Sequence, residues 1–310
     1  MDKKNVLSIK NLNKIYSKKS DKPIHAINNL NLDVQEGEIF GLLGPNGAGK
    51  TTFINILAGT VIKTSGKVNV WGFDLDNNPR QVRASIGIVP QEVNLDPFFT
   101  PRKLLELQAG LYGVKKKDRI TDAILKLVSL EDHANSYARS LSGGMKRRLL
   151  IAKSLVHQPP IIILDEPTAG VDVRLRKNLW ENVKLLHGQG VTIILTTHYL
   201  AEAEEMCDRI GILSKGNLVA LDSTKNLLNK IQTKKVTFKL DKSAKIGNNE
   251  LSSLKVLSLK ENEISLSYEK NRIEMEEIIN LIKKDNVRIL DISTEDGDLE
   301  DVFLRLTKNR

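Results

Sequence analysis

The sequence is short of cysteine, of aromatic residues and of long apolar runs. Cys207 is the only cysteine among 310 residues, so no internal disulfide can form, and we expect a reducing compartment. Aromatic residues make up only 5% of the chain, which argues against a stacking platform for single-stranded nucleic acid. No stretch approaches the roughly 18–20 apolar residues of a membrane helix, and the first residues lack the apolar core of a signal peptide. We therefore expect a cytoplasmic protein.

The chain does have the length and apolar content for about two folded domains. Hydrophobic residues make up 40% and charged residues 27%, which is typical of globular proteins. The 47 Lys and Arg residues exceed the 38 Asp and Glu residues, giving a net charge of +9. Residues 231–310 contain 15 of each sign, so the whole excess lies in residues 1–230. This positive charge could attract nucleic acid, an anionic membrane surface or phosphorylated small molecules.

The apolar pattern changes along the chain. Strand signals dominate the first 90 residues, helix signals dominate an insert at about 92–158, and short apolar runs at 161–164 and 191–196 indicate buried parallel strands. In the insert, Thr100 and Pro101 predict a helix start, and Leu104, Leu105, Leu107 and Leu111 predict its buried stripe. Residues 1–230 are expected to form one domain, and residues 231–310 a small α+β domain.

A glycine-rich loop follows the predicted strand that ends at Leu43. It matches the pattern G-x-x-x-x-G-K-[ST] before a helix, in which backbone N–H groups and a helix N-terminus surround phosphate oxygens. Lys50 would reach the β- and γ-phosphates, and the Thr51 hydroxyl would bind Mg²⁺. The predicted nucleotide-binding residues of this loop are Gly44, Pro45, Asn46, Gly47, Ala48, Gly49, Lys50, Thr51 and Thr52.

An acidic pair ends the apolar run at 161–164. Asp165 and Glu166 would lie at the carboxyl end of a buried strand, where ligands bind in open α/β sheets. We expect Asp165 to hold Mg²⁺ through water, and Glu166 to polarise a water for attack on the γ-phosphorus.

A second candidate anion site precedes the acidic pair. Ser142, Gly143 and Gly144 open a basic helix, and a serine and two glycines there present N–H donors without bulky side chains. With the P-loop and the acidic pair, this order of motifs resembles the ATP-binding subunits of ABC transporters over about residues 5–230. The resemblance implies an α/β fold of the P-loop NTPase (ABC ATPase) type, with an antiparallel β subdomain and a helical insert.

The same resemblance implies further site residues. Tyr16 would stack on adenine, Gln91 would sense Mg²⁺ and water and serve as a metal ligand, and His198 would contact the γ-phosphate. Asp172 would belong to the loop that links the two ATP sites, where Val171 departs conservatively from the usual leucine. Residues 142–144 would contact the ATP of a second subunit, so that the catalytic residues would be Lys50, Gln91, Glu166 and His198.

Finer features resemble exporter ATPases of the daunorubicin-resistance type, which transport drugs and polysaccharides. These features are LSGGMKRR at 141–148, DEPTAGVD at 165–172 and the extra C-terminal domain. They imply an ATP- and Mg²⁺-dependent homodimer that powers a separate membrane permease from the inner face of the cell membrane, with no nucleic acid bound. The alternative is a soluble ABC-type ATPase that acts on nucleic acid or ribosomes.

Two groups of residues receive surface or packing roles. Val93, Leu95, Phe98 and Phe99 are candidates for a groove that receives a permease helix, with packing of the insert as the equal alternative. Lys146, Arg147 and Arg148 are assigned to a basic surface facing an anionic membrane. The remaining histidines are expected to be surface or packing residues: His25, His133, His157 and His187.

Overall fold

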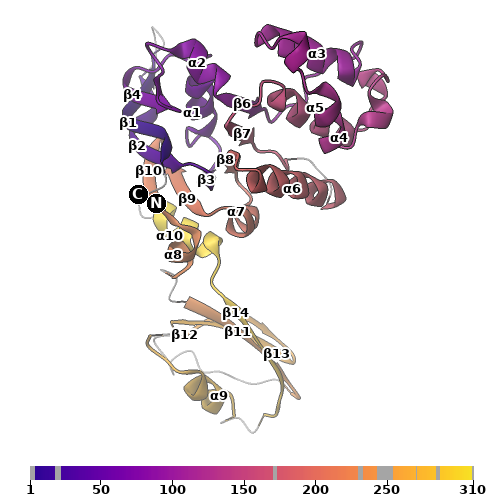
Figure 1. Cartoon of the computed structure of the whole chain (residues 1–310). Helices are drawn as coiled ribbons and strands as arrows, with labels where there is room; N and C mark the ends of the chain where they lie inside the picture. Colours follow the sequence, from indigo (N-terminus) through magenta and orange to yellow (C-terminus); the bar gives the residue numbers. More distant parts are fainter. Residues whose placement is uncertain are drawn as a thin grey trace. The chain divides into compact units, whose positions relative to one another are not determined.

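The computed structural model describes residues 4–17, 22–169, 173–229, 233–242, 254–269, 271–283 and 287–308. The chain divides into two compact units, Met1–Ser223 and Thr224–Arg310 (Figure 1). Each unit has its own cluster of buried apolar residues. Within the described part of the chain, none of the helices combines the length and the apolar character needed to cross a membrane.

An antiparallel sheet forms one part of the larger unit. Its strands, in the order β2-β1-β4-β5, are β1 (Asn5–Tyr16), β2 (Ile24–Gln35), β4 (Ser65–Val70) and β5 (Phe73–Asp74). Leu12 lies opposite Leu30 in the pairing of β1 with β2, and both are fully buried. Because side chains alternate between the faces of a strand, one face of this sheet joins the core while the other remains polar.

A six-stranded sheet forms the centre of the larger unit, in the order β10-β9-β3-β8-β7-β6. Its strands are β3 (Ile39–Leu43), β6 (Ile86–Val89), β7 (Ile161–Asp165), β8 (Thr192–Thr197), β9 (Arg209–Ser214) and β10 (Asn217–Ser223). Strands β6, β7, β8, β3 and β9 run parallel, and only β10 pairs antiparallel. The carboxyl ends of β3, β6, β7 and β8 therefore meet along one edge.

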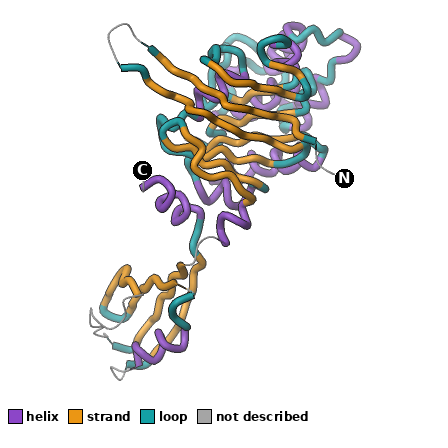
Figure 2. Tube along the Cα trace, turned by 90° about the vertical axis from the view of Figure 1, so that its left-hand side faces the viewer, coloured by secondary structure: helices purple, strands orange, loops and turns teal. Residues whose placement is uncertain are grey.

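Helices complete the central layer. They are α1 (Lys50–Leu57), α2 (Pro79–Ala84), α6 (Val173–Gly188) and α7 (Leu200–Met206). Phe53 and Ile56 of α1 pack in the same buried cluster as the apolar residues of β1 and β2. In Figure 2 the strands of this unit form layers towards the viewer, and most of its helices lie behind them.

The helical insert separates β6 from β7 and forms its own group of helices (Figure 1). They are α3 (Pro101–Leu111), α4 (Thr121–Leu127) and α5 (Gly143–Leu155), with single turns η1 (Lys116–Asp118), η2 (Glu131–His133) and η3 (Ala138–Ser140). Thr100 caps α3 as expected, because its hydroxyl accepts a hydrogen bond from Lys103 N at 3.3 Å.

The predicted apolar stripe of α3 is half wrong. Leu104 and Leu105 are buried, but Leu107 is exposed and Leu111 is 74% exposed. The buried residues of α3 are Pro101, Leu104, Leu105 and Ala109. Three of these follow a four-residue spacing, so this row, rather than the one through Leu111, faces the insert.

The smaller unit is an α+β domain. Its elements are α8 (Thr224–Asn229), β11 (Thr233–Leu240), β12 (Leu254–Lys260), β13 (Glu263–Glu269), α9 (Met275–Lys283), β14 (Ile289–Asp296) and α10 (Leu299–Lys308). The strands form one antiparallel sheet in the order β12-β13-β11-β14. Ile278 and Ile282 of α9 pack with Phe238 and Leu266 of the sheet. The unit begins at Thr224, a few residues before the boundary expected near residue 230.

Candidate active site

The glycine-rich loop leaves β3 and enters α1 in a conformation that two glycines make possible. A Cβ on Gly44 would lie 2.6 Å from Leu213 O. Gly49 has φ +111°, and a Cβ there would lie 2.4 Å from Ala26 O. Both glycines are therefore required by the protein's own packing, before any ligand is considered.

The rest of the loop is open. Gly47 has φ +78° with no atom within 4 Å of an ideal Cβ, and Pro45 and Asn46 are exposed. The first turn of α1 contains no acidic residue, and Thr51 is exposed. An exposed loop of backbone amides at an uncompensated helix N-terminus suits an anion.

Three side chains from three different strand ends meet at Glu166, which follows β7. Lys50 Nζ lies 3.4 Å from Glu166 Oε1. Gln91 Nε2, beyond β6, donates to Glu166 Oε2 at 3.2 Å, and His198 Nδ1, beyond β8, lies 3.1 Å from the same oxygen. Residues far apart in the sequence thus converge on one buried carboxylate. Of the predicted catalytic residues, the structure brings all four together: Lys50, Gln91, Glu166 and His198.

Thr196 on β8 fixes the backbone and the carboxylates at this edge. Its hydroxyl donates to Asp165 Oδ1 at 2.6 Å, and Glu166 N donates to Thr196 O at 3.0 Å. Glu166 has φ +44°, a left-handed conformation that is uncommon outside glycine. Burial raises the pKa of Asp165, and the hydrogen bond from Thr196 partly offsets that rise. The sequence analysis did not identify Thr196 as a site residue. Only its position on a predicted buried strand could have indicated this role.

Thr51 and Asp165 are the residues that fit a magnesium ion. The Thr51 hydroxyl is exposed beside the loop, and Asp165 bears a second carboxylate oxygen besides the one that Thr196 contacts. Among the described residues no three His, Cys, Asp or Glu side chains gather as a metal cage. Mg²⁺ at phosphate sites commonly uses one or two protein oxygens, substrate oxygens and water, so this sparse donor set suits it. The Gln91 amide nitrogen is engaged by Glu166, so its role as a metal ligand stays a prediction.

The helix that begins after Ser142 presents a bare N-terminus. Ser142 Oγ accepts from Met145 N at 3.3 Å, which is an N-cap. Ser142 and Gly143 are exposed, Gly144 is buried, and the first turn of α5 has no acidic residue. A Cβ on Gly143 would meet nothing within 4 Å. Among the described residues, no hydrogen bond or ion pair links this helix start to the P-loop of the same chain.

Tyr16 and Asp172 are the remaining predicted residues. Tyr16, at the end of β1, is 39% exposed, and Lys14 Nζ lies 4.6 Å from its ring centroid. The ring therefore remains accessible for stacking. Asp172 lies outside the described residues, so its predicted place between two ATP sites stays a prediction.

Arg147 was assigned to a basic surface, and that assignment is wrong. Its residue is only 4% exposed, and its guanidinium donates hydrogen bonds to the backbone oxygens of four residues beside the catalytic edge: Pro90, Gln91, Glu166 and Pro167. The signal was present in the sequence, because Arg147 lies three residues after Gly144 and three before Leu150, on the buried row of α5.

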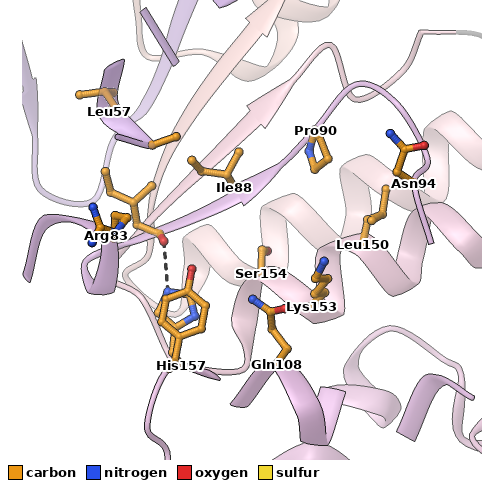
Figure 3. A pocket seen from close by; sticks show the side chains of 13 residues that line it. Leu57, Arg83, Ile88, Pro90, Asn94, Gln108, Leu150, Lys153, Ser154 and His157 are labelled. Carbon is orange, nitrogen blue, oxygen red and sulfur yellow. Dashed lines mark hydrogen bonds between the residues drawn. The ribbon is translucent and has the colours of Figure 1, made fainter. Parts of the chain in front are cut away.

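A groove of about 400 Å³ opens beside the Gln91 segment, between the central sheet and the insert. His157 lies in it, stacked on Tyr112 with ring centroids 3.7 Å apart, and its Nε2 donates to Ile86 O at 3.1 Å (Figure 3). Burial lowers the pKa of His157, consistent with the packing role expected for it. The lining residues come from both sides: Leu57, Ala58, Arg83, Ile86, Ile88, Pro90, Asn94, Gln108, Tyr112, Leu150, Lys153, Ser154 and His157.

The four residues proposed for a partner groove lie elsewhere. Val93, Leu95, Phe98 and Phe99 are absent from the lining of this groove. Phe98 is 69% exposed, with the Arg139 guanidinium 5.9 Å from its ring centroid. The described groove is lined by residues of α1, α2, β6, α3 and α5, and the partner groove expected at the four residues stays a prediction.

Comparison with known proteins gives concordant results. Residues 27–169 match a family model described as ABC transporter. The chain is 33% identical to the linearmycin resistance ATP-binding protein LnrL of Bacillus subtilis (strain 168), over 97% of this chain and 98% of that protein. It is 42% identical to the Nod factor export ATP-binding protein I of Rhizobium sp. (strain N33), over 65% of this chain and 67% of the relative.

Two solved structures are similar in fold. The dimeric post-hydrolysis state of the ATP-binding cassette MJ0796, bound to ADP and Pi, is 30% identical with a TM-score of 0.62, covering 70% of this chain and 98% of that one. A structure described as the ATP-binding subunit of an ABC transporter is 28% identical with a TM-score of 0.64, covering 73% and 92%. The predicted fold class is confirmed.

Proposed function

The chain belongs to the ATP-binding subunits of ABC transporters and is an ATPase, and from that premise we propose that it powers export through a separate membrane permease. ATP would bind between the P-loop of one subunit and residues 142–144 of a second, identical subunit. The observation that carries this proposal is an asymmetry within the chain. The catalytic carboxylate of Glu166 is surrounded by its own chain, whereas the helix N-terminus at Ser142 and Gly143 is exposed.

A second subunit supplies what this chain lacks at the P-loop. Developing charge on a transferred phosphoryl group needs electrostatic stabilisation, and an arginine supplied in trans can be worth roughly 10³–10⁵ in rate. Among the described residues, no arginine forms a hydrogen bond or ion pair with the side chain of Lys50 or Glu166. The amides and hydroxyl at the start of α5 would serve that need from the partner, which supports a homodimer with two sites.

Glu166 would act on the attacking water. Lys50, Gln91 and His198 contact its carboxylate. When Lys50 turns to the β- and γ-phosphates, Glu166 Oε1 becomes free to orient a water and to accept the proton of that water. Gln91 and His198 would position that water and the γ-phosphate. Tyr16 would stack on the adenine. Mg²⁺, held by Thr51 and Asp165, would neutralise phosphate charge when bound.

The permease would dock in the groove beside Gln91. The groove joins the insert to the segment that carries a residue in contact with Glu166, so an occupant there can influence catalysis. The positive charge of residues 1–230 suits a position at the anionic inner face of the cell membrane. The names of the relatives, which refer to resistance and to export, support export as the direction.

The first test is Glu166→Gln. We expect turnover to fall roughly 10²–10⁴-fold, because the amide cannot accept the proton, and a stable dimer to form with Mg-ATP, measured by light scattering. Glu205→Gln is the matched control, since Glu205 is an exposed carboxylate paired with Lys184 at 3.1 Å. A Glu166→Gln protein that stays monomeric and hydrolyses ATP at the full rate would refute the proposal.

The second test separates transport from the nucleic-acid alternative. The tagged chain, isolated from detergent-solubilised membranes, should bring with it one polytopic membrane protein, and Lys50→Ala should abolish export without disrupting that complex. Salt-sensitive duplex binding with no membrane partner would instead favour the soluble ATPase.

A further inference from the structure

Arg147 is a buried cation whose hydrogen bonds, among the described residues, all go to backbone oxygens. Its Nε donates to Pro167 O at 2.9 Å and its Nη2 to Glu166 O at 2.9 Å. Its Nη1 donates to Gln91 O at 2.6 Å and to Pro90 O at 3.1 Å. In the part of the chain that the structure describes, this guanidinium forms no ion pair. An arginine that binds carbonyls in this way uses its planar set of donors to fix geometry.

The four carbonyls belong to two loops that both carry predicted catalytic residues. Pro90 and Gln91 follow β6, whereas Glu166 and Pro167 follow β7. Arg147 itself belongs to α5, whose first turn is Ser142, Gly143 and Gly144. One guanidinium therefore joins the glutamine, the catalytic glutamate and the signature helix in a single hydrogen-bonded unit.

The electrostatic setting favours a fixed position. Burial lowers the pKa of Arg147, and the nearby Asp165 opposes that change. The carbonyl of Glu166 also accepts from Ala169 N at 3.1 Å, and Pro90 and Gln91 are exposed, so the fixed position rests on the four bonds acting together. One side chain of α5 is therefore hydrogen-bonded to both loops.

We propose that Arg147 is a positioning residue that couples the start of α5 to Glu166 and Gln91 of the same chain. This rests on the proposed function, in which the start of α5 contacts the ATP of the partner subunit. A small shift of α5 on that ATP moves the carbonyls of Glu166 and Gln91 and aligns their side chains. The nucleotide bound at one site thereby affects the alignment of the catalytic residues at the other site.

Arg148 provides a control from the next position of the same helix. Its Nη1 donates to Val128 O at 2.8 Å and Ser129 O at 2.9 Å, both within the insert. Arg147 and Arg148 therefore share their chemistry and differ in what they join. A lysine at either position keeps the charge and loses the planar fork of donors.

The experiment compares Arg147→Lys with Arg148→Lys in the full-length chain, measuring kcat, KM for ATP, the Hill coefficient and the melting temperature. We expect Arg147→Lys to lower kcat roughly 10- to 100-fold, the scale of a misplaced catalytic group, with KM little changed and the Hill coefficient lowered towards 1. Arg148→Lys should keep kcat within about twofold. Equal losses of kcat in the two variants at matched melting temperatures would overturn the proposal, as would an Arg147→Lys protein with normal kcat and Hill coefficient.

A second measurement avoids dependence on a variant at Arg147. In the Glu166→Gln protein, Mg-ATP should slow amide hydrogen exchange at Gln91 and at Glu166, Thr168 and Ala169 together with residues 142–147, and Ser142→Arg should remove all three effects at once. Protection of 142–147 alone would overturn the coupling. Failure of the Glu166→Gln protein to dimerise would count against the proposed function instead, so the two failures are distinguishable.

Discussion

The P-loop and the start of α5 are the two candidate anion sites, and the fold shapes them differently. The P-loop is formed by the chain's own contacts: Gly49 lies against Ala26, and Lys50 Nζ donates to Gly44 O at 2.7 Å. At the start of α5, Gly143 has no neighbour within 4 Å of a Cβ. The fold of the chain itself shapes the P-loop, whereas the start of α5 is open to a group from outside the chain.

This contrast bears on how a single chain would be kept from hydrolysing ATP without its partner. Under the proposed function, a chain alone would have the groups that bind ATP and orient water, and the remaining donors at the γ-phosphate would come from a second chain. Hydrolysis would then depend on assembly, which requires that the two sites act on the same ATP.

The largest effect should come from pairing two defective chains. Lys50→Ala damages the P-loop, and Ser142→Arg blocks the start of α5; each homodimer should lose roughly 10²–10³ in kcat or more, as expected for loss of a transition-state donor. A mixture should regain activity, because a mixed dimer has one site with both halves intact. The readout is ATPase rate against mixing ratio. A mixture as inactive as its components would show that the two sites do not complement each other across chains.

The next effect separates the two glycines. Gly49→Ala should lower the melting temperature and abolish ATP binding, since the added Cβ would lie 2.4 Å from Ala26 O at a φ of +111°, and strain of this kind costs on the order of 1–3 kcal/mol. Gly143→Ala should leave the melting temperature within about 1–2 °C, because it adds a methyl group in open space on a helix, and should lower only kcat. Differential scanning calorimetry and ATP titration distinguish these outcomes; equal destabilisation would remove the contrast.

The smallest effect concerns pH. Glu202 is buried on α7, where Thr168 Oγ1 donates to its Oε2 at 2.7 Å and Arg176 Nε lies 3.2 Å from Oε1. Burial raises its pKa above 4.5, and the hydrogen bond from Thr168 and the charge of Arg176 oppose this. The folded state therefore binds the proton more tightly, so this contribution to stability is present below about pH 4.5 and is lost as pH rises through the folded pKa. Relative to the wild type, Glu202→Gln should gain stability from pH 4 to pH 7 in denaturant unfolding. A constant difference would contradict this.

Local patterns predicted most of the larger unit. The strand, loop and helix around Gly44–Thr52 follow from neighbouring residues, so their bounds come within one or two residues of the structure. The convergence of Gln91 and His198 on Glu166 came from resemblance, because no local pattern measures distances between strand ends. Asp172 and the domain roles stay predictions.

Other features were not predicted, because two patterns in the sequence favoured different positions for the same residue. Arg147 lies in the basic run 146–148, and charge favoured a surface position while helical spacing placed it on the buried row. In α3, Leu107 and Leu111 are good helix formers but lie outside the buried row. Strand β12, whose Val256 and Leu259 are partly exposed, was not predicted.

The adjacency of β6 and β7 has a consequence for how the chain folds. Val89 pairs with Leu164 in the parallel ladder, although the whole insert lies between them. Closing a longer loop costs only about 0.6 kcal/mol for each doubling of its length, so the insert can change in size at little thermodynamic cost. The kinetic cost is larger, since long-range parallel pairing is slow. During synthesis, the groups around Glu166 can meet only after His198 has emerged, so the catalytic edge is among the last parts of this unit to form.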